Sequence, residues 1–131
     1  MVLYDARVEI EHKDFLPEVH DTWMSIRQLS TYTIHFCQTY DLFKYERNEN
    51  QQQILSNQLK LLDDTIYELS FTIHQRIRKL EQIAEPILNE FYSKIMIEQK
   101  STNYIPAYIR IIENQLKSLQ FSFKQILNKY N

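Results

Sequence analysis

The chain has 131 residues, a formal net charge of −2, 44% hydrophobic residues and no glycine. An average chain of this length would contain about nine glycines, and tight turns, phosphate-binding loops and nucleophile elbows depend on them. The composition therefore disfavours most nucleotide-dependent enzymes, and the near-neutral charge gives no general attraction to nucleic acid or anionic membranes.

Residues 1–13 precede the first predicted helix. Between Tyr4 and His12, apolar residues such as Ala6 and Val8 alternate with charged ones, which is the two-residue period of a β-strand. A single strand cannot satisfy its own hydrogen bonds. A strand added to a partner, a short helix and a flexible arm therefore stay open, and we favour an arm or a short helix.

The first helix is predicted over about residues 14–46. Asp14 can cap its first turn, and Pro17 falls where backbone N–H groups have no partner within the helix. We expect Trp23 and Cys37 to be buried. The helix carries a net charge of −3, which favours packing beside a basic neighbour.

The second helix is predicted over about residues 50–99, after a polar break at residues 47–51. Its apolar residues follow the heptad steps of a helix packed against other helices: Leu55, Leu59, Leu62, Ile66, Leu69, Ile73, Ile77, Leu80, Ile83 and Ile87. The regular step after Ile73 would fall on Arg76, and the apolar residue Ile77 next to it takes that place in the ladder. Pro86 removes one backbone hydrogen bond and clashes with the preceding turn, so we expect a kink or a break there.

The third helix is predicted over about residues 103–129 and has a net charge of +3. Its heptad ladder is complete and comprises Ile105, Ile109, Ile112, Leu116, Leu119, Phe123, Ile126 and Tyr130. The sequence thus predicts an all-α fold of one domain spanning residues 1–131. We expect an elongated antiparallel bundle of three long helices, or of four if Pro86 breaks the second.

Apolar residues that lie outside the heptad ladders of the predicted helices are the main indication of function in the sequence. Aromatic residues are favoured anchors at protein interfaces, although a wider buried face within the bundle would also explain them. The predicted partner-binding residues are Tyr67, Phe71, Tyr104, Tyr108, Ile111 and Phe121.

Two other functions remain open. A small helical enzyme or metal protein could use Glu9, His12, His20 and His35, since Glu9 and His12 have the Glu-x-x-His spacing of di-iron bundles. Only one copy of that spacing is present, whereas a metal site needs several converging ligands. A nucleic-acid-associated protein could use Arg76, Arg78 and Lys79, although these side chains point around much of the helix.

The sequence therefore favours a non-enzymatic interaction module without a cofactor or a small-molecule substrate. Such a module would be an adaptor, a small complex subunit or a helical chaperone that binds another helical protein or itself. The single cysteine cannot form an internal disulfide. Charged residues within residues 1–10 occupy the place where a signal peptide would need an apolar segment. No apolar run reaches the roughly 18 residues of a membrane span. We expect an intracellular, cytoplasmic protein.

Overall fold

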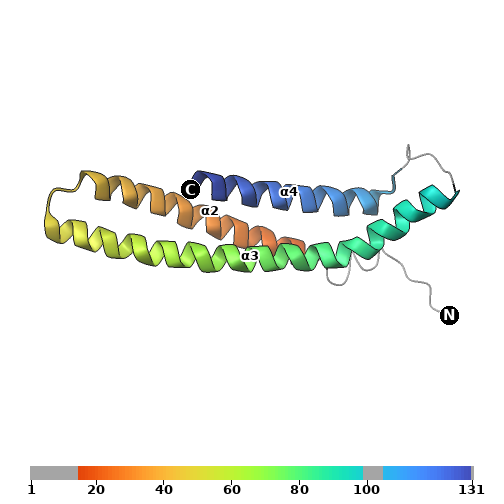
Figure 1. Cartoon of the computed structure of the whole chain (residues 1–131), viewed down its shortest axis with the longest axis horizontal. Helices are drawn as coiled ribbons and strands as arrows, with labels where there is room; N and C mark the ends of the chain where they lie inside the picture. Colours follow the sequence, from red (N-terminus) through yellow and green to blue (C-terminus); the bar gives the residue numbers. More distant parts are fainter. Residues whose placement is uncertain (1–14, 99–104, 131) are drawn as a thin grey trace.

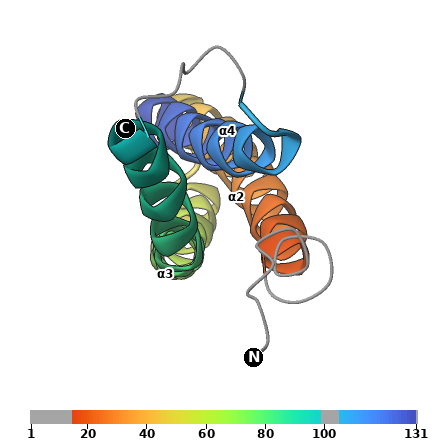
Figure 2. The same ribbon diagram turned by 90° about the vertical axis from the view of Figure 1, so that its right-hand side faces the viewer.

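The computed structural model describes residues 15–98 and 105–130. They form three α-helices, α2 (Phe15–Tyr45), α3 (Glu49–Glu98) and α4 (Ala107–Tyr130), and no strand is present among these residues. The helices run alternately along one long axis (Figure 1) and occupy the corners of a triangle when viewed down it (Figure 2). The predicted all-α antiparallel bundle of three helices is confirmed, whereas the predicted N-terminal arm lies outside the described residues.

The helix boundaries follow local capping. The side-chain oxygen of Asn48 accepts hydrogen bonds from the backbone N–H groups of Asn50 and Gln51, at 2.9 and 3.1 Å, and so caps the start of α3. α4 begins at Ala107, later than the predicted residue 103. Proline disfavours helical geometry in the residue before it, and the Pro106 carbonyl accepts the first helical hydrogen bond, from Arg110.

The core lies where all three helices run together. The ladder residues Ile66, Ile73 and Leu80 of α3 are buried and belong to one core cluster with residues of α2 and α4 such as Leu29 and Leu119. Ile77 is also buried, which confirms that it replaces Arg76 in the seam. The other buried hydrophobic residues of the cluster are Phe15, Val19, Ile26, Ala84, Ile87, Ile109 and Ile112.

α3 continues through Pro86 without a break. The predicted alternative of four helices is therefore wrong. Figure 1 shows that the C-terminal part of α3 turns aside, toward α4, which agrees with a kink. Pro86 itself is exposed, while Ala84 and Ile87 on either side of it are buried, so the missing hydrogen bond lies on the solvent side of the helix.

A charged cluster joins α2 to α3. Glu18 is buried, and its carboxylate accepts hydrogen bonds from Arg76 at 3.1 Å and Lys79 at 3.4 Å. A buried carboxylate needs such partners to offset the loss of water. α2 and α4 also contact each other, through a hydrogen bond of 3.1 Å from the Trp23 indole to Gln115. No ion pair joins α2 to α4 among the described residues, so their opposite net charges are not needed to explain this packing.

The bundle has two regions that differ in the number of helices. Tyr130 at the end of α4 packs edge-on against Phe36 of α2 and donates a hydrogen bond to Asp63 of α3. Beyond this point α2 and α3 continue as a pair, while α4 stops well before the turn that joins them (Figure 1). We refer to residues 37–61 as the two-helix end and to the remainder of the described bundle as the three-helix body.

Candidate functional site

The last turns of α2 present apolar side chains to solvent. Ile34, Leu42 and Tyr45 are exposed, with Leu42 at 63% and Tyr45 at 79% of their full accessible area. They lie among Gln38, Asp41 and Glu46 in two adjacent columns at helical spacing. We call these six residues the α2 end surface.

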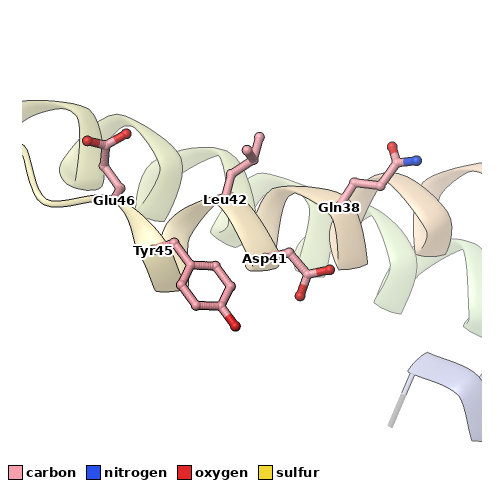
Figure 3. Close-up of a pocket in the computed structure, with 5 residues that line it drawn as sticks. All are labelled: Gln38, Asp41, Leu42, Tyr45 and Glu46. Carbon is pink, nitrogen blue, oxygen red and sulfur yellow. The ribbon is translucent and has the colours of Figure 1, made fainter.

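The α2 end surface is shallow and open. Five of its residues line a hollow of about 540 Å³, namely Gln38, Asp41, Leu42, Tyr45 and Glu46. Figure 3 shows that Asp41 and Tyr45 project to one side of α2 and Gln38, Leu42 and Glu46 to the other. The Lys44 ammonium lies 5.9 Å from the centre of the Tyr45 ring, at cation–π distance. This shape suits a broad helical partner better than an enclosed small molecule.

A groove between α2 and the end of α4 adjoins this surface. It has a volume of about 270 Å³, and its lining includes Ile34, Cys37, Ile126, Lys129 and Tyr130. Cys37 is exposed, so the prediction that it is buried is wrong. Cys37 lies instead in the wall of this groove, opposite Ile126 and Tyr130 in the last turns of α4.

The predicted partner-binding residues do not form one surface. Tyr67 and Phe71 are exposed one turn apart on α3, and Tyr67 lines a separate groove with Tyr130. Ile111 and Phe121 are exposed on α4, whereas Tyr108 is half-buried and packs against the core. Tyr104 lies outside the described residues.

Leu42 and Tyr45 were not among the predicted site residues. α2 buries hydroxyl side chains, including Thr22, Ser25 and Thr33, each of which donates a hydrogen bond to a backbone carbonyl one turn earlier. These polar residues interrupt the apolar period of α2. Its buried and exposed faces were therefore hard to separate by pattern alone.

The residues considered for metal binding do not converge where the structure describes them. His20 and His35 are both exposed on α2, and fifteen residues of helix separate them by about 22 Å. Within residues 15–98 and 105–130, no three His, Cys, Asp or Glu side chains are grouped as metal ligands. Glu9 and His12 lie outside these ranges.

The basic residues considered for nucleic-acid binding are all paired. Arg76 and Lys79 contact Glu18, and Arg78 lies 4.0 Å from Glu81. The backbone of α3 thus places these three cations beside carboxylates of the same bundle. Each of the three therefore has an acidic partner, with Glu18 shared between Arg76 and Lys79.

One tyrosine has a perturbed proton affinity. The Tyr92 hydroxyl donates a 2.5 Å hydrogen bond to the Glu113 carboxylate, which links the end of α3 to α4. This hydrogen bond, with smaller contributions from burial and from the negative charge of Glu113, raises the pKa of Tyr92 above its ordinary value of 10.0. A raised pKa keeps the phenol protonated, so Tyr92 is a structural donor rather than a base.

No known protein family, characterised protein or solved structure matches the chain. None of the helices that the structure describes has an apolar stretch long enough to cross a membrane.

Proposed function

We propose that this protein is a non-enzymatic interaction module, an adaptor or small subunit that binds a helical partner through the two-helix end. The supporting observation is the contrast between a filled core in the three-helix body and exposed Leu42 and Tyr45 where α4 is absent. Apolar side chains gathered at helical spacing are typical of protein interfaces. The intracellular, cytoplasmic location expected from the sequence belongs to the same proposal.

The off-seam residues add secondary contacts in this proposal. Tyr67, Phe71 and Phe121 are each exposed on α3 or α4, and an aromatic side chain that enters a partner's pocket contributes more than its neighbours. Because these residues face different directions, we expect them to contact different parts of a partner or different partners.

The test is recovery of the intact complex from the native cell, followed by mass measurement. The double substitution Leu42→Ser with Tyr45→Ser should lose the partner while the chain remains helical. Met96→Ser with Ile97→Ser is the matched control, since these two residues are at least as exposed and lie at the far end of α3. Recovery of no complex with the unaltered chain, or equal loss with both pairs, would contradict the proposal.

A further inference from the structure

The solvent-facing side of α4 carries a basic stripe. Its residues follow the same steps of four and three as the buried ladder of this helix, and all of them are exposed. We call them the α4 outer stripe: Arg110, Asn114, Lys117, Phe121, Lys124 and Asn128. The stripe contains no acid, and its three cations form no ion pair with the residues that the structure describes. Phe121 is 64% exposed and lies one helical turn from both lysines.

Carboxylates at the α3–α4 interface are engaged in hydrogen bonds between the two helices. Glu113, the only acid of α4, accepts a hydrogen bond from Tyr92 of α3. Glu81 of α3 accepts one of 3.1 Å from Gln120, and Asp63 accepts one from the last residue of α4. The positive charge of the stripe therefore faces solvent, and a partner that docks on it is expected to be acidic.

The spacing of the cations favours one kind of acidic partner. Arg110, Lys117 and Lys124 recur every seven residues, which places them about 10 Å apart along α4 with a drift of about 20° per step. In a second helix packed along the stripe, one heptad position recurs at the same interval. The phosphates of a nucleic-acid strand recur about every 3.4 Å, so most of them would face no cation. Polybasic segments that bind anionic membranes carry about four to eight cations, more than this stripe offers.

The sequence of the described helices excludes a second copy of this chain as the occupant. Within residues 15–98 and 105–130, no two acids are seven residues apart. A second copy therefore cannot present consecutive carboxylates to Lys117 and Lys124 from one heptad position of these helices.

We infer that the α4 outer stripe docks an acidic helix of a different protein, with carboxylates at seven-residue intervals and an apolar side chain over Phe121. Exposed ion pairs contribute little affinity, so the carboxylates set the register and orientation of the helix, while the contact with Phe121 excludes water between the two lysines. This surface is additional to the one in the proposed function and does not depend on it, because the two-helix end lies beyond the end of α4 (Figure 1).

The inference is tested by NMR titration of the full chain with a synthetic peptide. The probe is an alanine-rich helix of about 21 residues, with glutamate at every seventh position and one leucine between the second and third glutamates. Amide signals of the stripe should shift. A peptide of the same composition with redistributed glutamates should bind about fivefold more weakly or worse.

Charge exchange tests the pairing itself. Lys117→Glu with Lys124→Glu should raise the dissociation constant of the probe about tenfold or more, and a probe with lysine in place of glutamate should bind this variant better than it binds the unaltered chain. Arg27→Glu with Lys60→Glu is the matched control, since both are exposed cations on α2 and α3. It should change the constant by less than about twofold.

A second pair of variants tests the apolar contact. Phe121→Ser should weaken binding several-fold, whereas Leu61→Ser, at a site 67% exposed on α3, should not. Equal binding of the two peptides, equal effects of the two charge reversals, equal effects at Phe121 and Leu61, or no binding up to the solubility limit of the probe would each overturn the inference.

Two further probes distinguish other anionic partners. A single-stranded oligonucleotide or phosphatidylserine vesicles that bind more tightly than the peptide, and through Lys117 and Lys124, would overturn the inference in favour of that class. Leu42→Ser with Tyr45→Ser should leave the dissociation constant of the peptide unchanged. Failure of the peptide to bind would therefore leave the proposed function standing, since recovery of the cellular complex tests that function separately.

Discussion

The three-helix body and the two-helix end are built from the same two long helices, and the presence of α4 distinguishes them. Within the body, ladder residues such as Ile73 and Leu80 are fully buried. Within the end, Leu55 and Leu59 belong to the same heptad ladder but are only half-buried. Two helices can cover only part of each other's apolar surface, so the same pattern supplies a core in one region and an accessible surface in the other.

The largest expected difference between the regions is the effect of removing a seam leucine. Leu80→Ala should reduce the free energy of unfolding by roughly 2 to 5 kcal/mol, because it leaves a cavity under three helices. Leu59→Ala should reduce it by roughly 1 to 2 kcal/mol, since its side chain already contacts water. Denaturant unfolding measures both, and equal losses would show that the two-helix end is packed as tightly as the body.

The charged cluster on Glu18 should give the next largest effect. Glu18→Ala removes two charge-assisted hydrogen bonds and leaves Arg76 partly buried, at an expected loss of about 1.5 to 3 kcal/mol. Glu90→Ala is the control, because Glu90 forms an exposed pair with Lys94 at 3.3 Å, and such pairs contribute about 0 to 1 kcal/mol. If the two variants unfold at the same denaturant concentration, the cluster does not stabilise the junction of α2 and α3.

The smallest expected effect is a pH dependence at the other end of the body. The pKa of Tyr92 is raised by its hydrogen bond to Glu113, so the folded state holds this proton more tightly than the unfolded state does. The contribution is fully present below about pH 10, the unfolded pKa, and is lost as the pH rises through the higher folded pKa. As the pH is raised from about 8 to about 11, the free energy of unfolding should therefore fall less in Tyr92→Phe than in the unaltered chain. Parallel plots of unfolding free energy against pH for the two chains would contradict this assignment.

The sequence predicted α3 well because its heptad ladder is nearly continuous. Its predicted range of about 50–99 compares with an observed Glu49–Glu98. Spacing alone also predicted that Ile77, and not its neighbour Arg76, fills the seam position after Ile73. The predicted start of α4, residue 103, is too early, because Pro106 does not occupy the same place in its helix as Pro17 does in α2. Pro17 lies within the first turn of α2, whereas Pro106 lies just before α4.

The candidate surface was only partly predictable. Heptad spacing identified Phe121 as outward-facing, and its exposure agrees. Spacing did not indicate that Tyr108 packs against the core or that α4 ends beside Phe36, because both depend on where separate helices meet. The α2 end surface was missed since threonine and serine occupy the buried face of α2.

The measurement that most directly tests the division between body and end is the free energy of unfolding of the double variant Leu42→Ser with Tyr45→Ser. It should be made by denaturant titration at a concentration where the chain is monomeric. Because these side chains face solvent in the monomer, we expect a value within about 0.5 kcal/mol of the unaltered chain. A loss as large as that of Leu80→Ala would place Leu42 and Tyr45 in the core and would contradict a binding surface at the two-helix end.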